Sequence, residues 1–216
     1  MNRIFIDLEM NSVSREYKEA RICSRWEVIE FGAVCLNDEN RETGRFHSYV
    51  RPEYNHRVTA YISELTGIKT SQVKNAESFK TVFENFTSWC GSNYRIYSWS
   101  DTDLLQLQKE MELKGIENSP ETLYMFEHWE DLQKDFSNLL FLEKQTSLSM
   151  AVANAGVTFK GNAHNALTDA LAAADIYREM SEGRNLKQIN TMLTDAQRPI
   201  GSSLGDLLKD VILQPE

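Results

Sequence analysis

The chain has 216 residues, of which 41% are hydrophobic and 25% are charged, which suits one globular domain with a sizeable core. Its formal net charge of −9 at pH 7 argues against a protein that coats nucleic acid through a basic surface. The charge does not exclude an enzyme that grips a short piece of nucleic acid through metal ions, since bound divalent cations would cancel negative charge locally.

Targeting signals are absent from the sequence pattern. No run of about 18 apolar residues occurs, so we expect neither a transmembrane helix nor a membrane partner. The opening residues hold a short apolar run broken by Asp7, which does not fit a signal peptide. The cysteines at positions 23, 35 and 90 are odd in number and lack CxxC spacing. They predict free thiols rather than a zinc site, and with them a cytoplasmic protein.

The first part of the chain is rich in strand-forming residues. Residues 3–9 and 26–36 predict two strands, with a polar loop between them. Residues 36–46 carry the Asn, Asp and Gly of a hairpin turn, and a third strand at 46–52 is stopped by its terminal proline. Three strands joined in this way predict an antiparallel meander.

Helices and strands then alternate. The predicted elements are helices at 58–65 and 77–90, a strand at 95–99, a helix at 103–115, a strand at 125–132, and helices at 147–156 and 163–175. This order predicts an α/β domain on a mixed sheet, with antiparallel strands followed by parallel ones. We place the domain at residues 1–180. The remainder, 181–216, predicts a helical tail that packs back on the domain or, alternatively, binds a partner.

Two acidic residues interrupt the first strand. Asp7 and Glu9 are two positions apart and therefore point to the same face, whereas Ile6 and Leu8 point to the other face, into packing. Neighbouring carboxylates repel each other and need a cation, a shared proton or an arginine. A metal site and the solvated face of an edge strand explain this pair equally well.

A third acid, Asp103, follows the predicted strand at 95–99 and begins a helix. Loops in this position commonly hold ligands in α/β proteins. Capping of the helix is the competing explanation, because Asp is common at helix starts. Asp101 competes with Asp103 for either role.

The stretch AHNALTDALAAAD holds the remaining candidates, His164 and Asp169. Small apolar residues let this helix sit close to the sheet, where a carboxylate is costly unless it meets a cation. His164 precedes the helix and could lie over a metal without binding it. A surface histidine and a solvated aspartate are the alternative.

Taken together, carboxylates from three separated segments suit Mg²⁺ or Mn²⁺ better than zinc. Two such ions roughly 4 Å apart stabilise both the attacking and the leaving oxygen in phosphodiester cleavage. A histidine that is free to take a proton would activate the water.

The sequence resembles the DEDDh 3′-5′ exonucleases of the ribonuclease H-like fold, a family that includes RNase T and the DNA polymerase III epsilon subunit. Three motifs carry the resemblance in the family's order: IDLE at 6–9, SWSDTDLLQL at 98–107 and HNALTD at 164–169. WEVIEFGAV at 26–34 and ISELTGI at 62–68 are similar to the branch that contains the histone-mRNA 3′ exonuclease and KapD.

The second motif departs from the family, because it lacks the asparagine that often precedes the aspartate. We choose Asp103 over Asp101 because Leu104 and Leu107 follow it at the family's spacing.

The resemblance implies an exonuclease that binds the 3′ end of single-stranded RNA or DNA and releases nucleoside 5′-monophosphates. RNA is slightly favoured through the branch, and a homodimer is a candidate assembly. The implied cofactors are two divalent metal ions, Mg²⁺ or Mn²⁺. The implied site residues are Asp7, Glu9, Asp103 and Asp169 as metal ligands, His164 as general base, and Met10, Leu65 and Thr66 as contacts of the terminal nucleotide.

Two other functions compete. A catalytically weak nucleic-acid-binding or regulatory module on the same fold predicts a lost acid or histidine, but all five positions are present. A glycosidase would need more widely separated carboxylates than one strand face provides, and would leave His164 unexplained. Among the aromatic residues, Trp26, Tyr97 and Trp99 are candidates to stack on a base, although core packing is the commoner role.

Overall fold

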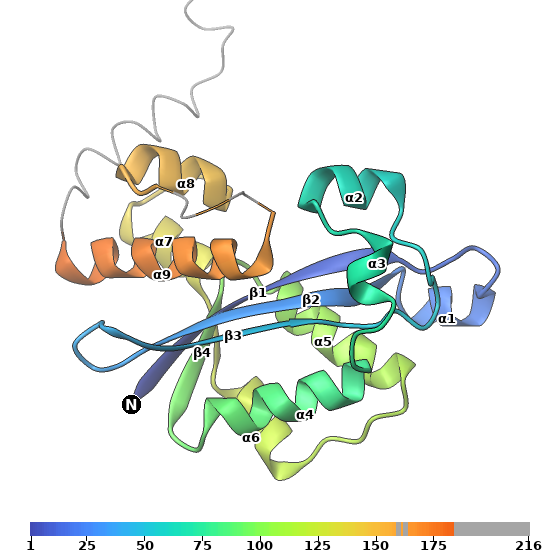
Figure 1. The fold of residues 1–216 in the computed structure, drawn as a ribbon. Coiled ribbons are helices and arrows are strands. Elements are labelled where there is room, and N and C mark those ends of the chain that lie inside the picture. Colours follow the sequence, from blue (N-terminus) through green and yellow to red (C-terminus); the bar gives the residue numbers. More distant parts are fainter. Residues whose placement is uncertain (159–160, 162–163, 184–216) are drawn as a thin grey trace, which may run out of the picture.

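In the computed structural model, residues 1–158, 161 and 164–183 are described. The predicted tail from residue 184 onward therefore lies outside the described residues. One mixed sheet with strand order β3-β2-β1-β4-β5 forms the centre of the domain (Figure 1). Its strands are β1 (Asn2–Ser12), β2 (Trp26–Leu36), β3 (Glu42–Tyr49), β4 (Tyr94–Ser98) and β5 (Trp129–Asp131).

The pairing of the strands confirms the predicted fold class. β1 pairs antiparallel with β2, and β2 pairs antiparallel with β3, which is the expected meander. β4 then pairs parallel with the other side of β1, and β5 pairs parallel with β4. β1 therefore lies in the middle of the sheet, with partners on both sides along its first residues.

Helices cover both faces of this sheet (Figure 1). No helix in the described part of the chain combines the length and the apolar character needed to cross a membrane. The helices are α1 (Lys18–Cys23), α2 (Ala60–Thr66), α3 (Thr70–Val73), α4 (Phe79–Cys90), α5 (Thr102–Leu113), α6 (Pro120–Glu127), α7 (Leu132–Leu139), α8 (Leu148–Ala155) and α9 (Ala166–Glu182).

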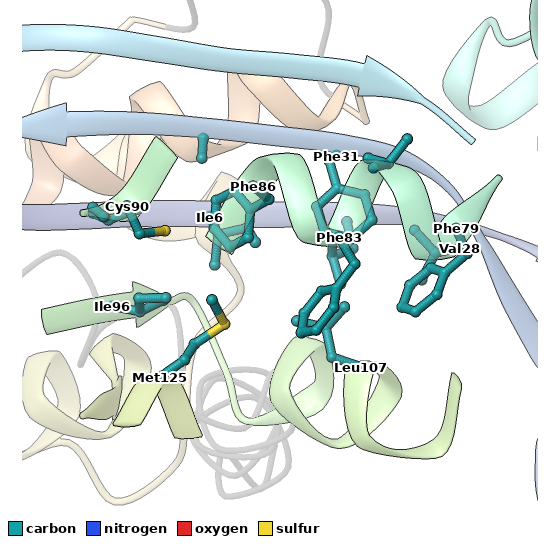
Figure 2. Packing of buried hydrophobic residues seen from close by; sticks show 14 of the residues in the cluster. Ile6, Val28, Phe31, Phe79, Phe83, Phe86, Cys90, Ile96, Leu107 and Met125 are labelled. Atoms are coloured by element: carbon teal, nitrogen blue, oxygen red, sulfur yellow. The ribbon is translucent and has the colours of Figure 1, made fainter. Parts of the chain in front are cut away.

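The core on one face is built around Phe31 of β2. Its ring centroid lies 5.7 Å from that of Phe86 and 6.0 Å from that of Phe79, both on α4. Figure 2 shows these rings between the sheet and Leu107 of α5. Ile6 of β1 belongs to the same cluster, so this face of β1 is held in an apolar environment.

The core on the opposite face joins β1 and β2 to α7, α8 and α9. Phe5 and Val34 pack there with Leu171 of α9, together with other buried residues of these helices. Because side chains alternate along a strand, the residues that follow Phe5 on this face are Asp7 and Glu9. This face of β1 is therefore apolar at Phe5 and acidic at Asp7 and Glu9.

Several predicted boundaries were wrong. The segment between β1 and β2 is not only a loop, because α1 forms within it and β1 extends to Ser12. The third strand runs from Glu42 to Tyr49, earlier than predicted. The predicted strand at 125–132 is mostly helix: the side chain of Ser119 accepts a hydrogen bond from the Thr122 amide and begins α6, leaving only β5 as strand. The helices α3 and α7 were not predicted.

The approach of α9 to the sheet depends on Gly32 of β2. A Cβ atom at this position would lie 2.0 Å from the backbone nitrogen of Leu167 and 2.1 Å from the carbonyl carbon of Ala166. No side chain fits there, because both contacts are to backbone that cannot move independently. The start of α9 therefore rests directly on the β2 backbone.

Replacing Gly32 by alanine should destabilise the fold. We expect Gly32→Ala to lower the free energy of unfolding by about 1–3 kcal/mol or more, because α9 must move away from β2. Urea denaturation measures the change.

Gly44→Ala in β3 is the matched control, since its added Cβ would lie 3.6 Å from the Trp89 ring, an ordinary contact. The control should stay within about 1 kcal/mol of the parent protein. Equal losses for the two variants would contradict the proposed close contact.

Candidate active site

The first pair of candidate residues lies on β1, on the face that α9 covers. Asp7 and Glu9 follow Phe5 of the α9-side core, whereas Ile6 and Leu8 pack in the opposite core. The shared face predicted from the sequence is therefore present in the structure. Asp7 interacts electrostatically with Asp103, Glu9 and Asp169, which brings all four predicted acids into one region.

Asp103 reaches this region from the start of α5. Its side chain is buried, and its Oδ1 atom accepts a hydrogen bond from the backbone N–H of Leu8, 3.2 Å away. Asp101 is exposed, and its side chain makes no capping hydrogen bond to α5. Of the two rivals, only Asp103 lies beside β1.

His164 and Asp169 come from the start of α9. Ligand atoms of Glu9, His164 and Asp169 all lie within 4.8 Å of one another. The backbone N–H of His164 donates to Oδ2 of Asp169 at 3.1 Å, and His164 has a φ of 62°. A positive φ is uncommon outside glycine and is maintained only where surrounding contacts fix it. His164 itself is exposed to solvent.

One oxygen of this cluster has no partner among the described residues. Oδ1 of Asp169 is buried and forms no hydrogen bond with them, although Oδ2 of the same carboxylate accepts one. A buried polar atom without a partner is costly and points to a ligand that would satisfy it. An all-oxygen donor set with an unsatisfied carboxylate oxygen fits Mg²⁺ or Mn²⁺. The carboxylates suited to hold such ions are those of Asp7, Glu9, Asp103 and Asp169.

Burial and mutual repulsion make these carboxyl groups hard to ionise. Burial, followed by the charge of Asp103, raises the pKa of Asp7 well above its usual value. Burial and the charge of Asp169 raise the pKa of Glu9 to about 8, and burial raises the pKa of Asp103 to about 7. Burial also raises the pKa of Asp169. A bound cation would reverse these shifts, because it favours the charged form.

The three residues predicted to contact the terminal nucleotide differ in how exposed they are. Leu65 is 38% exposed on α2 and lines a cavity of about 390 Å³ with Tyr61 and Glu64. Met10 is partly buried and packs against the core formed with α4 and α5. The hydroxyl of Thr66 donates to the carbonyl of Ile62 at 2.8 Å, at the end of α2. Leu65 is therefore the one of the three whose surface is open.

Sequence reasoning missed Glu30, which lies opposite Glu9 in the β1–β2 register. Its carboxylate is fully buried, and both oxygens have partners. Oε1 lies 2.9 Å from the Asn165 amide and 2.7 Å from Nε2 of His47, and Oε2 accepts from the Ala166 N–H at 3.0 Å. Glu30 therefore fastens the start of α9 to β2. An acid between Ile29 and Phe31 was the signal that could have revealed it.

Comparisons with known proteins place the chain among exonucleases. The model of the RNase_T exonuclease family matches residues 4–177. Human 3′-5′ exoribonuclease 1 is 28% identical over 191 residues, covering 82% of this chain and 53% of that protein. The Drosophila melanogaster 3′-5′ exonuclease Snipper is 26% identical over 204 residues, covering 85% of this chain and 69% of that protein.

A solved structure shares the fold. The nuclease domain of 3′hExo, described as a DEDDh family member bound to rAMP, superposes with a TM-score of 0.72 at 25% identity. The match covers 84% of this chain and 92% of that domain. The chain spans about half the length of the curated human relative, 53%.

Removing the Glu30 carboxylate should loosen the start of α9. Glu30→Ala leaves the Asn165 amide and the Ala166 N–H without their partner, so we expect a loss of about 2–4 kcal/mol in the free energy of unfolding. Urea denaturation measures the loss. His47→Ala removes only the half-exposed partner and should cost under about 1 kcal/mol. A small and similar loss for both variants would refute the anchoring role.

The site also predicts how stability changes with pH. Because the folded-state pKa values of Glu9 and Asp103 are raised to about 8 and about 7, the metal-free protein should lose stability as pH rises from about 5 to 8. Mn²⁺ should restore this stability at pH 8, because it binds the deprotonated groups. Thermal unfolding with Mn²⁺ and with EDTA measures both effects.

Asp103 and Asp101 form a matched pair for this measurement. Asp103→Asn removes a buried charge, so the Tm of the metal-free protein at pH 8 should rise by about 2–4 °C for each kcal/mol of free energy gained. The increase in Tm that Mn²⁺ causes should become smaller. Asp101→Asn, at an exposed position, should change neither quantity. If Asp101→Asn has the larger effect on the Mn²⁺ response, the assignment of Asp103 to the site is wrong.

Proposed function

The chain belongs to the RNase_T exonuclease family, whose model matches residues 4–177, and on that basis we propose that it is a metal-dependent 3′-5′ exonuclease. It hydrolyses single-stranded nucleic acid from the 3′ end and releases nucleoside 5′-monophosphates. The observation that carries the proposal is the carboxylate cluster beside His164, in which Oδ1 of Asp169 is buried and lacks a partner among the described residues.

Asp7, Glu9, Asp103 and Asp169 would hold two divalent ions. When bound, such ions supply stabilisation of the attacking and the leaving oxygen. The protein's own groups place the ligands: the Leu8 N–H orients Asp103, and the His164 N–H orients Asp169. The hydrogen bond from its own backbone to Asp169 also fixes His164 at the rim of the cluster. Its exposed imidazole would take the proton of the attacking water on a ring nitrogen.

The 3′-terminal nucleotide would lie between the start of α9 and α2. Leu65 would contact its base or sugar, because this side chain is open on α2. Met10 and Thr66 complete the proposed contacts, with Met10 following a register irregularity of β1 immediately after Glu9. An irregularity of this kind changes the direction of the side chains that follow it.

RNA is the favoured substrate over DNA. Support comes from the relatives, since the human protein is named an exoribonuclease and the 3′hExo nuclease domain holds rAMP. The catalytic domain would comprise residues 1–180. That boundary is supported by the end of the family match at residue 177 and by the end of α9 at Glu182. Residues 181–216 would form an appended tail.

The proposal predicts metal-dependent shortening of oligonucleotides. With Mn²⁺, 5′-labelled single-stranded 20-mers should give a ladder that shortens from the 3′ end, with RNA degraded faster than DNA. EDTA should abolish the ladder, because it removes the ions and the carboxylates alone cannot stabilise the attacking and leaving oxygens. His164→Ala should lower the rate by about 10²–10⁴-fold, the usual contribution of a general base.

His56→Ala is the control, because His56 is also exposed and its ring nitrogen lies 3.2 Å from the Pro52 carbonyl, within its own loop. This variant should keep the parent rate. Intact RNA and DNA under every metal condition would overturn the enzyme proposal. They would instead support a binding or regulatory module that has kept its acids.

A further inference from the structure

A basic groove lies between α1 and α5. Arg21, Arg25 and Lys109 line it together with Trp26 and Gln106, and its volume is about 520 Å³. We call it the α1–α5 groove. No carboxylate is among its lining residues. None of its three cations forms an ion pair with any part of the chain that the structure describes.

The other side of α1 has the opposite character. A hollow of about 610 Å³ there is lined by Glu16, Glu19 and Glu112, with Lys18 as its one lysine. Phosphates are repelled from that side and attracted to the α1–α5 groove. α1 therefore separates an acidic surface from a basic one, which gives the segment between β1 and β2 a physical role that the catalytic cluster does not require.

The α1–α5 groove is connected to the site through α5 and β1. Gln106 follows Asp103 by about one helical turn, roughly 5 Å along α5. The side-chain amide of Gln106 donates to the carbonyl of Trp26 at 3.0 Å. Trp26 pairs with Ser12, which lies three residues beyond Glu9 on β1. A strand whose 3′ end occupies the carboxylate cluster can thus enter the groove within a few nucleotides.

The groove presents both kinds of group that hold a single strand. The Trp26 indole is 43% exposed, so a face is available for a base. Arg21 is fixed by a hydrogen bond of 2.6 Å from its Nη1 to the Val13 carbonyl, which leaves its other donors for a phosphate. The Cys23 thiol contacts the Lys109 carbonyl at 3.6 Å and joins α1 to α5. An aromatic surface among cations is a common design for sequence-independent binding of single strands.

We propose that the α1–α5 groove binds the single strand upstream of its 3′ end, with Trp26 stacking on a base and Arg21, Arg25 and Lys109 contacting phosphates. This inference rests on the proposed exonuclease function and deepens it. The groove lies beside the reacting end, so it acts on affinity for longer strands and leaves the hydrolytic step itself unchanged. The enzyme would therefore prefer a strand of several nucleotides to a dinucleotide.

The test compares a fluorescein-labelled U12 strand with the dinucleotide UpU. Affinity for U12 is measured by anisotropy with Mn²⁺ in a His164→Ala background, where the strand persists. Hydrolysis of UpU and of U12 is measured with His164 intact. The variants are Trp26→Ala, Trp26→Phe and the double change Arg25→Ala with Lys109→Ala. Phe141→Ala and Lys80→Ala are controls at an exposed aromatic and an exposed lysine elsewhere on the surface.

We expect Trp26→Ala to weaken U12 binding about tenfold and Trp26→Phe to restore it, because a ring is retained. The double variant should reduce the dependence of log Kd on log salt concentration by about 0.7 for each lost phosphate contact. Hydrolysis of UpU should stay within twofold for every variant, and the controls should match the parent protein.

Two results would overturn the groove assignment. One is unchanged affinity for U12 in the Trp26 variants and the double variant. The other is a loss of U12 binding matched by an equal loss of UpU hydrolysis, which would indicate general damage to the protein. If the parent protein hydrolyses neither oligonucleotide, the proposed function fails. The anisotropy arm still decides whether the groove binds the strand, so the two failures are distinguishable.

Discussion

The burial and mutual repulsion of four carboxylates, two of them buried and two half-buried, form the constraint on which the rest of this structure depends. Asp7, Glu9, Asp103 and Asp169 come from β1, α5 and α9, and burial raises the pKa of each of them. Repulsion between neighbouring like charges costs free energy, and the cost grows as the local dielectric constant falls. The fold supplies that free energy through two apolar cores, one on each face of the sheet. The unfavourable free energy is confined to this cluster, and a bound divalent cation would reduce it.

Placement of α9 shows how strongly the rest of the chain supports this cluster. Gly32 lets the helix start rest on the β2 backbone, and Glu30 satisfies the N–H of Ala166 and the side chain of Asn165. These two residues lie on the same face of β2, two positions apart. Neither has a free group to offer a metal, since Gly32 has no side chain and both Glu30 oxygens are occupied. They fix geometry, whereas Asp169 keeps an oxygen available.

The sequence predicted features that depend on local periodicity and missed those that depend on distant contacts. β2 was predicted at its observed bounds, and the common face of Asp7 and Glu9 follows from alternation alone. Helix-capping preference did not separate Asp103 from Asp101, because either residue suits a helix start, so Asp103 was chosen only on the leucine spacing of the resembled family. It is the Leu8 N–H, 95 positions away, that distinguishes them. Glu30 was hidden for the same reason, and the run at 125–132 was misread because a capped helix and a strand compete for the same apolar residues.

Net charge and local charge have different consequences for nucleic-acid binding. A total of −9 disfavours any mode that spreads a long polyanion over the surface. An enzyme that acts on a chain end needs only a few phosphate contacts. In the proposed mode, ions at the carboxylate cluster would provide some of them and the cations of the α1–α5 groove would provide the others. The acidic hollow beside α1 repels the strand, whereas the α1–α5 groove attracts it. On this view, the negative charge does not hinder the proposed activity but helps restrict it to the 3′ end of a single strand.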